Sequence, residues 1–306
     1  MSRRMLLLTE GQSDPVPAKT AVCLLRYCPD EVVAVLDSTR AGETAQDVFG
    51  VGGSRPVVGR LEEAPEAQTL VIGIAPSGGR VPAEWRSVIG AALRRGMHVV
   101  SGLHEFLGDD PEFAELARDS GSTITDVRKN DELDVSTGLG IRPECLRILT
   151  VGQDCSVGKM VASVELAQGL TARGTRAKFI ATGQTGIMIE GDGCPIDRVI
   201  SDFLAGAVEK MLLAHQGHEV LVFEGQGSLS HPKYSAVTLG LLHGARPQGM
   251  ILCYEAGRKH VSFMPHVPLT PLGRLVEVYE QVANLVSPGL VIGIAANTRR
   301  FDDDEA

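Results

Sequence analysis

Aromatic side chains and positive charge are both scarce in this 306-residue chain. Phe, Trp and Tyr make up 4% of it, and 38 acidic residues outnumber 29 basic ones, which leaves a formal net charge of −9. Binding a nucleic-acid backbone needs a surplus of Lys and Arg, and binding single strands needs aromatic stacking platforms. The composition therefore argues against nucleic acid as a partner. It remains compatible with a local basic pocket.

Clustered cysteines and long apolar runs are absent as well. The N-terminal apolar run, residues 5–8, is too short for a secretory signal, and no run approaches the ~20 residues that span a membrane. The cysteines form no CxxC pair or CxxxH cluster, so no metal site is predicted; they are Cys23, Cys28, Cys145, Cys155, Cys194 and Cys253. We expect a reduced, cytoplasmic protein with no membrane partner.

Short runs rich in Val, Ile and Leu alternate with longer amphipathic stretches. This alternation is typical of βα units on a parallel sheet whose two faces are covered, and it predicts the α/β class. Strands are predicted at residues 32–36, 69–75, 98–101, 147–151, 177–181, 220–224, 249–254 and 290–295. Helices are predicted at residues 83–95, 113–119 and 161–173.

The segment 127–144 is polar and rich in Asp, Gly and Pro, and the alternation restarts after it. We place a domain boundary here. The prediction is a Rossmann-like domain at 1–140 and a P-loop NTPase-like domain with a mostly parallel sheet at 141–306. Asp37 ends a strand of the first domain, where a ribose-binding acid would stand. No GxGxxG motif precedes it, so a dinucleotide site has little support there.

A glycine-bracketed loop between a predicted strand and a predicted helix is the most specific motif. Such a loop points several backbone N–H groups at one anion, and the helix dipole and a lysine add positive charge. We predict that it binds the phosphates of a nucleotide-like cofactor; the alternative is an ordinary strand–turn–helix. Its residues are Gly152, Gln153, Asp154, Cys155, Ser156, Val157, Gly158, Lys159 and Met160.

The residue after the loop lysine is Met160. An ordinary P-loop has Ser or Thr there, and its hydroxyl binds Mg²⁺. A thioether does not replace that hard oxygen ligand. Either Mg²⁺ is held by other groups, or the loop binds phosphates without transferring them.

Two polar loops follow other predicted strands, where ligands of open α/β sheets collect. The first, residues 181–186, leads into the acidic segment 190–197. The second follows the strand at 220–224. Candidate substrate ligands are Thr182, Gln184, Thr185, Glu190 and Gln226, and candidate catalytic residues are Glu224, His231 and Ser228. For the first loop the alternative is a polar connection with turn glycines.

Glu224 stands where a Walker B carboxylate would, and His231 has an unperturbed pKa near neutrality, suited to deprotonating an amine. A satisfied structural histidine is the alternative. Arg258 begins a basic cluster after another strand end. It is a candidate ligand of a substrate dicarboxylate or of cofactor phosphates, and a solvated basic cluster is the alternative.

Three motifs together resemble one protein family: residues 152–160, 181–186 and 224–232. The phosphate loop is one residue longer than the Walker A pattern and resembles that of the dethiobiotin synthetase branch of P-loop proteins. The resembled family joins an N-terminal Rossmann-like domain to a C-terminal P-loop domain. The resemblance is to its DgcN type and implies D-glutamate N-acetyltransferase activity. The resemblance covers most of the chain, but its specific motifs lie only in the second half.

Acetyl-CoA as the cofactor agrees with Met160, because acyl transfer to an amine needs a base and a carbonyl-polarising donor but no Mg²⁺. The phosphate loop would then hold the CoA phosphates. Glu224 or His231 would deprotonate the amino-acid substrate, and Gln226, Ser228 or the Gly-rich loop amides would polarise the thioester. We expect a small-molecule partner and a homo-oligomer.

The alternative is an ATP-dependent kinase or ligase of the dethiobiotin synthetase type, in which Asp154 or Glu224 holds Mg²⁺. A non-catalytic nucleotide sensor is a third possibility. The residues alone do not identify the acceptor amino acid or its handedness.

Overall fold

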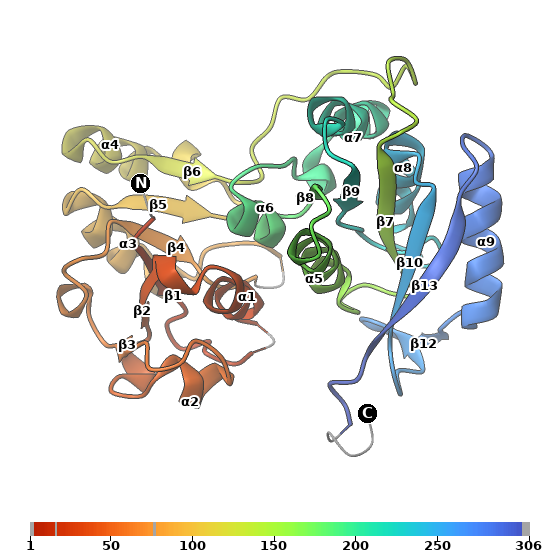
Figure 1. Cartoon of the computed structure of the whole chain (residues 1–306). Coiled ribbons are helices and arrows are strands. Elements are labelled where there is room, and N and C mark those ends of the chain that lie inside the picture. Colours follow the sequence, from red (N-terminus) through yellow and green to blue (C-terminus); the bar gives the residue numbers. More distant parts are fainter. Residues whose placement is uncertain (1–2, 16, 76–77, 302–306) are drawn as a thin grey trace. The chain divides into compact units, whose positions relative to one another are not determined.

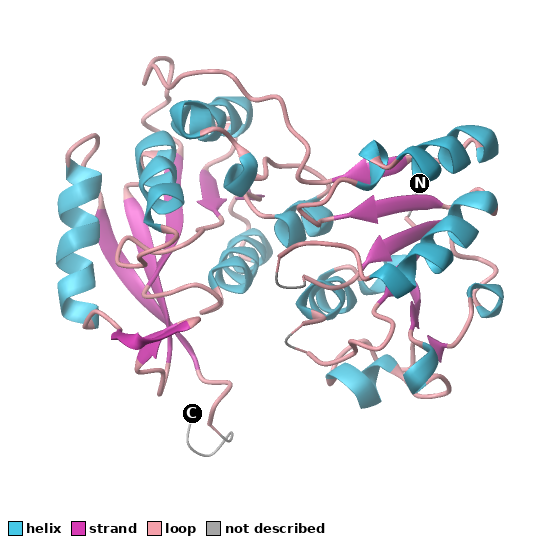
Figure 2. Cartoon of the chain, turned by 180° about the vertical axis from the view of Figure 1, so that it is seen from behind, coloured by secondary structure: helices cyan, strands magenta, loops and turns pink. Residues whose placement is uncertain are grey.

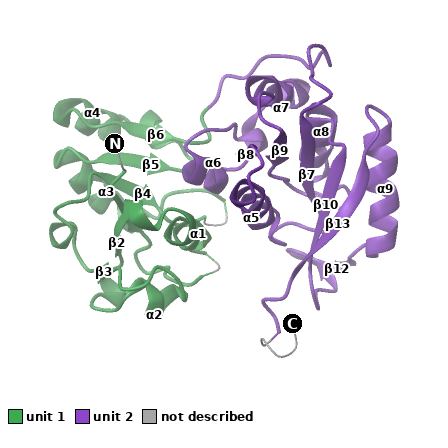
Figure 3. Ribbon diagram, in the orientation of Figure 1, with its two compact units in different colours: residues 1–129 green, residues 130–306 purple. Residues whose placement is uncertain are grey.

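The computed structural model describes residues 3–15, 17–75 and 78–301 (Figure 1). The chain divides into two compact units between Lys129 and Asn130 (Figure 3), whereas the sequence placed the boundary after residue 140. Each unit is built on a parallel sheet flanked by helices (Figure 2), as predicted for the α/β class. Among the described helices, none is long and apolar enough to cross a membrane.

The first unit holds a six-stranded parallel sheet in the order β3-β2-β1-β4-β5-β6, which is the strand order of a Rossmann fold. Its strands are β1 (Met5–Leu8), β2 (Val32–Leu36), β3 (Val57–Val58), β4 (Thr69–Ile72), β5 (His98–Ser101) and β6 (Ile124–Asp126). Its helices are α1 (Lys19–Tyr27), α2 (Ala45–Phe49), α3 (Arg86–Arg94) and α4 (Pro111–Ser120).

Strand β1 was not among the predicted strands, although it lies at the centre of this sheet between β2 and β4. Leu6, Leu7 and Leu8 are fully buried, because both faces of the sheet are covered. Four consecutive apolar residues show no alternation, so periodicity does not distinguish such a strand from other short buried segments.

The second unit holds a five-stranded parallel sheet in the order β13-β10-β7-β9-β8, with a small antiparallel pair, β11 and β12. The strands are β7 (Leu146–Gly152), β8 (Ala177–Ile180), β9 (Val220–Phe223), β10 (Gly249–Glu255), β11 (His260–Val261), β12 (Met264–Pro268) and β13 (Leu290–Asn297). The helices are α5 (Lys159–Ala172), α6 (Gln184–Glu190), α7 (Ser201–His215), α8 (Ser235–Ala245) and α9 (Leu272–Asn284).

The segment before β7 belongs to the second unit because helix α7 holds it. Glu209, which is 3% exposed, accepts hydrogen bonds from the Ser136 hydroxyl at 2.6 Å and from the amides of Thr137 and Gly138 at 2.8 Å each. One turn earlier, a Cβ on Gly206 would lie 1.9 Å from the carbonyl oxygen of Asp134. These contacts draw residues 134–138 onto α7 and explain why the unit begins before residue 141.

Candidate functional site

Most of the predicted site residues lie at the carboxyl ends of strands β7, β8, β9 and β10. Parallel strands expose these ends on one edge of the sheet, and ligands of open α/β sheets bind at that edge. The phosphate loop follows β7, the loop at 181–183 follows β8, and Glu224 follows β9. Three segments that are far apart in the sequence thus supply groups to one edge of the sheet.

The phosphate loop has the backbone of an anion cradle. Strand β7 ends at Gly152 and helix α5 starts at Lys159, with Gly158 at its N-cap in the left-handed region at φ 103°. Ser156 also has a positive φ of 55°. A Cβ on Gly152 would lie 2.8 Å from Nζ of Lys159. The fourteen-residue α5 directs its positive dipole end and its first amides at the loop.

Lys159 lies buried beside the loop. Its side chain is buried, with the residue 6% exposed, and Nζ donates to the carbonyl oxygen of Asp154 at 2.7 Å. Burial lowers the pKa of Lys159. A phosphate group at the loop would favour the charged ammonium and offset this effect, because an adjacent opposite charge stabilises the ionised form.

Arg258 clamps the phosphate loop from outside. Its Nη1 donates to Oδ2 of Asp154 at 2.8 Å and to the carbonyl oxygen of Cys155 at 2.9 Å. Its Nη2 donates to the carbonyl oxygen of Ser156 at 3.4 Å and to Glu255. With both terminal nitrogens engaged and its side chain 8% exposed, Arg258 holds the loop carbonyls on one side. Its predicted contact with substrate carboxylates stays a prediction.

Asp154 is saturated by donors. Besides Arg258, its Oδ2 accepts from the amide of Ser262 at 2.7 Å, and Oδ1 accepts from the amide of Cys155 at 2.7 Å. Ligand atoms of Asp154, Cys155 and His231 lie within 4.8 Å of one another, close enough to share a cation. The guanidinium already paired with Asp154, and the nearby Lys159, disfavour a metal ion there.

Two arginines that the sequence prediction did not single out, Arg299 and Arg300, lie near Arg258. Both guanidinium groups pair with Glu255, the last residue of β10, whose side chain is fully buried. Burial works to raise the pKa of Glu255, but hydrogen bonds from Arg300 and Arg258 outweigh it, so the pKa lies below its usual value. Two adjacent arginines shortly after a strand end were the available signal.

Glu224 is a buried carboxylate at the end of β9. It is 4% exposed, and its Oε2 accepts from the amides of Thr182 and Gly183 at 3.0 Å each, while Oε1 accepts from the Gln226 amide at 3.1 Å. Burial raises the pKa of Glu224 to about 7. Gly186 leaves the necessary space, since a Cβ there would lie 2.3 Å from Oε2.

His231 is 1% exposed and faces the phosphate loop. Its Nδ1 accepts from the amide of Lys233 at 3.1 Å, so the neutral ring carries its proton on Nε2, which lies 3.6 Å from Oδ1 of Asp154. Burial lowers the pKa of His231, which favours this neutral form. In this conformation neither ring nitrogen offers a lone pair to a substrate.

Ser228 is fully buried and supports the loop. Its hydroxyl donates to the carbonyl oxygen of Gln153 at 3.2 Å. Beside it, the Tyr279 hydroxyl donates to the carbonyl oxygen of Gly152 at 2.8 Å. The end of β7 is therefore fixed by side chains from the β9 loop and from helix α9.

The predicted substrate ligands separate into two places. Thr182 and Gln226 contact Glu224 and form a cluster with it. The Thr182 hydroxyl donates to the Glu224 carbonyl oxygen at 2.6 Å. Gln184 and Thr185 form the first turn of α6, which follows the same loop. Glu190, at the other end of α6, pairs with Lys178 Nζ at 2.7 Å. Lys178 lies near the amino end of β8, so Glu190 is apart from this cluster.

In the first unit, Asp37 binds its own chain. The carboxylate is fully buried and accepts from the Gly11 amide at 3.1 Å, from Thr39 and from Ser13. A ribose-binding acid needs an available carboxylate oxygen. The weak support for a dinucleotide site in this unit is thus not strengthened by the geometry.

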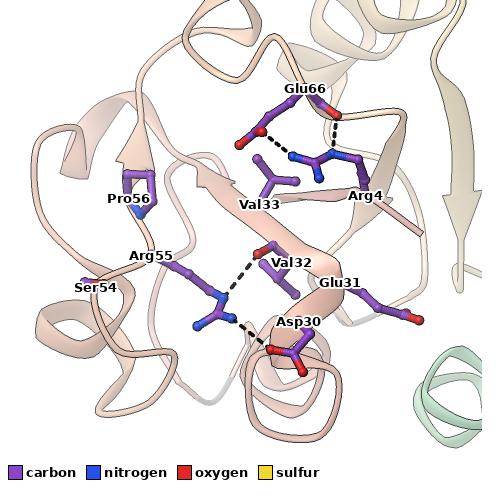
Figure 4. A pocket seen from close by; sticks show the side chains of 9 residues that line it. All are labelled: Arg4, Asp30, Glu31, Val32, Val33, Ser54, Arg55, Pro56 and Glu66. Carbon is purple, nitrogen blue, oxygen red and sulfur yellow. Dashed lines mark hydrogen bonds and ion pairs between the residues drawn. The ribbon is translucent and has the colours of Figure 1, made fainter. Parts of the chain in front are cut away.

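A cavity of about 400 Å³ opens at the amino ends of the first unit's strands (Figure 4). Arg4 pairs there with Glu66, and Arg55 donates to the Val32 carbonyl oxygen at 3.1 Å. These polar groups are internally paired, and this edge is opposite the one that binds ligands in open α/β sheets. We assign it no ligand.

A strand, an anion-cradling loop and a helix, with carboxylates at neighbouring strand ends, define a P-loop protein of the α/β class, here preceded by a unit with Rossmann strand order. The chain belongs to the DUF1611 family. Residues 134–306 match its model "Domain of unknown function (DUF1611_C) P-loop domain", and residues 38–130 match the DUF1611_N Rossmann-like domain. The predicted fold and the resemblance to this family are confirmed.

Two curated relatives are named D-glutamate N-acetyltransferase. The one from Tritonibacter scottomollicae is 36% identical over 302 residues, 98% of this chain and 88% of the relative. The one from a Pseudoalteromonas species is 38% identical over 233 residues, 76% of this chain and 70% of the relative. A crystal structure of a DUF1611 family protein from Anabaena variabilis, 41% identical, matches with a TM-score of 0.93 over 99% of this chain and 90% of that chain.

Proposed function

We propose that this protein is an N-acetyltransferase that moves the acetyl group of acetyl-CoA onto the amine of an amino acid, with D-glutamate as the acceptor. The names of the two curated relatives support the activity and the acceptor. The observation in the molecule that carries the proposal is Glu224, a buried carboxylate with a pKa of about 7 beside a phosphate loop. A general base works best when its pKa is near the working pH.

The phosphate loop fits CoA. Its amides, the α5 dipole and Lys159 offer a site for a pyrophosphate, and Arg258 holds the loop through Asp154 and the carbonyl oxygen of Cys155. Met160 offers no hydroxyl for Mg²⁺. In the ATP-dependent alternative Asp154 or Glu224 would hold Mg²⁺, and both carboxylates already accept hydrogen bonds from N–H donors.

In the proposed reaction, acetyl-CoA supplies an activated thioester carbonyl. Glu224 removes a proton from the substrate ammonium, and the amine nitrogen then forms a bond to the acetyl carbon. The carbon–sulfur bond breaks as the thiolate leaves, and the second proton lost by the nitrogen passes to the sulfur, which gives the amide and the free thiol of CoA. Gln226 is the partly exposed partner of Glu224, so a shift of its amide would uncover Oε1 for the substrate and offer a donor to the carbonyl oxygen.

Among the predicted bases, Glu224 is preferred to His231. The neutral His231 ring has its Nδ1 lone pair engaged by the Lys233 amide and its Nε2 proton facing Asp154. We assign His231 and Ser228 to positioning the phosphate loop, through Asp154 and the carbonyl oxygen of Gln153 respectively.

The test is thiol release from acetyl-CoA across a panel of D- and L-amino acids, in parallel with phosphate release from ATP and Mg²⁺. We expect turnover with D-glutamate and no hydrolysis or transfer from ATP. Mg²⁺-dependent ATP turnover without thiol release would contradict the proposal and would indicate an ATP-dependent kinase or ligase instead. Tight cofactor binding without any turnover would indicate a sensor.

A further inference from the structure

Three guanidinium groups converge on one buried carboxylate at the end of β10. Glu255 accepts from Arg258, Arg299 and Arg300, and its side chain is fully buried. A single arginine can pair with a carboxylate through two hydrogen bonds. Arg258 pairs with Glu255 and also with Asp154, so three guanidinium groups serve two carboxylates and one positive charge is left over.

The two outer arginines remain open to solvent. Their side chains are 47% exposed for Arg299 and 53% exposed for Arg300, against 8% for Arg258. Glu255 fixes one edge of each guanidinium and leaves other N–H donors for a ligand, since a guanidinium carries five. Fixing a long side chain in advance reduces the entropy lost when it binds an anion.

This cluster is adjacent to the phosphate loop. Glu255 pairs in register with Asn297, the last residue of β13, and a Cβ on Gly158 of the loop would lie 3.7 Å from Nδ2 of Asn297. Arg258 connects the phosphate loop to the arginine cluster, because it donates both to Asp154 in the loop and to Glu255. A ligand whose pyrophosphate occupies the loop would therefore have a second cationic group within the same unit.

The local charge favours a second anion. Among the residues that the structure describes here, three guanidinium groups pair with two carboxylates, Glu255 and Asp154, and Lys159 adds a further cation at the loop. This local excess of positive charge contrasts with the formal net charge of the whole chain, which is −9. The loop amides and Lys159 are sufficient to bind a pyrophosphate. Arg299 and Arg300 are therefore suited to bind an additional phosphate on the same ligand.

We propose that Arg299 and Arg300 form a subsite for a phosphate monoester next to the phosphate loop, which selects a nucleotide carrying both a 5′-pyrophosphate and a separate 3′-phosphate. The proposal rests on the proposed use of CoA, whose adenosine carries these two groups. It makes the arginine pair the determinant that distinguishes CoA from nucleotides without a 3′-phosphate.

The test compares the binding of CoA and 3′-dephospho-CoA by isothermal titration calorimetry. The wild-type protein should bind CoA at least about 10-fold more tightly, as expected for a lost pair of charge-assisted hydrogen bonds. In the double variant Arg299→Gln/Arg300→Gln, CoA affinity should fall to that of 3′-dephospho-CoA. Affinity for 3′-dephospho-CoA should stay within about 2-fold of wild type, and this unchanged binding also shows that the variant is folded.

The matched control is Arg274→Gln, which removes an arginine that is 60% exposed and pairs with Glu277 in α9 of the same unit. It should keep the full preference for CoA. Equal wild-type affinity for the two ligands, or a preference retained by the double variant, overturns the subsite while leaving CoA as the cofactor. Failure of the wild-type protein to bind either ligand overturns the proposed function as well.

Discussion

Nη1 of Arg258 lies 2.8 Å from Oδ2 of Asp154, the acidic residue inside the phosphate loop. The same nitrogen lies 2.9 Å from the carbonyl oxygen of Cys155. One guanidinium thus fixes a side chain and a backbone group of the loop together. These contacts fix the conformation of the loop, so under the proposed function little of the binding free energy would be used to order it.

Arg258→Lys should weaken cofactor binding more than it slows chemistry. A single ammonium cannot reproduce the fork of donors to Asp154, Cys155 and Glu255. We expect KM for acetyl-CoA to rise about 10-fold, with kcat changed less than about 3-fold, and a loss of about 3 kcal/mol in unfolding free energy from the disrupted buried pairs. Steady-state kinetics and urea denaturation measure both effects. A large fall in kcat with an unchanged KM would contradict the loop-clamping role.

Glu224→Gln should abolish the proton transfer and keep the cofactor site. General-base catalysis contributes about 10²- to 10⁴-fold, so kcat should fall by at least about 100-fold while the CoA dissociation constant stays within about 3-fold. Because the base must be ionised, wild-type kcat should rise with pH through about 7 and then level off. A wild-type profile with no inflection near this pH would remove Glu224 as the base.

The same carboxylate makes a stability prediction. The pKa of Glu224 is raised from 4.5 to about 7 in the folded protein, so the folded state favours the protonated form. Its stabilising contribution is complete below pH 4.5 and is lost as pH rises through about 7, by about 3 kcal/mol in total. The unfolding free energy of wild type relative to Glu224→Gln should decline over this window. A constant difference would show that the pKa is not raised.

Lys159→Met should weaken CoA binding by about 10- to 100-fold, the range for loss of a charge-assisted contact with a phosphate. The fold should be kept, because the new side chain is apolar and the position is buried. Calorimetric titration measures the effect. Lys210→Met, which removes a lysine of α7 that is 57% exposed, is the control and should bind as wild type does.

Removal of divalent metal should leave activity intact. Met160 supplies no hydroxyl, and Asp154 and Glu224 are engaged by N–H donors. Acetyl transfer in excess EDTA should stay within about 2-fold of the untreated rate, and Met160→Thr should gain no dependence on Mg²⁺. Loss of turnover in EDTA, restored by Mg²⁺, would mean that other groups bind the ion.

Glu209→Gln should loosen residues 134–138 from α7. The carboxylate accepts from Ser136, Thr137 and Gly138, and an amide would turn an NH₂ group toward some of these donors. We expect a loss of about 2–3 kcal/mol in unfolding free energy at pH 7. Although burial opposes it, hydrogen bonding lowers the pKa of Glu209, so its contribution is present above pH 4.5 and is lost as pH falls through the lowered pKa. A wild-type and variant difference that does not shrink as pH falls below 4.5 would contradict this origin.

Strands with flanking turn residues could be located from the sequence. Residues 32–36 and 98–101 coincide with β2 and β5, and the prediction at 147–151 falls within β7. Helices α7 and α8 were not predicted. Their residues are apolar on most sides because they pack against each other as well as the sheet, which weakens the helical period that a sequence pattern needs.

What the sequence determined by itself is local: the glycine-bracketed loop, the lysine that starts α5, and Met160 in place of a magnesium ligand all depend on residues adjacent in the chain. The tertiary structure decided which charged groups pair with one another. Arg258 and Asp154, more than a hundred residues apart in sequence, meet only because parallel strands β7 and β10 are neighbours and end at the same edge. The pKa of Glu224 likewise depends on burial under the loop after β8, since desolvation is a property of the packed protein and not of the residue.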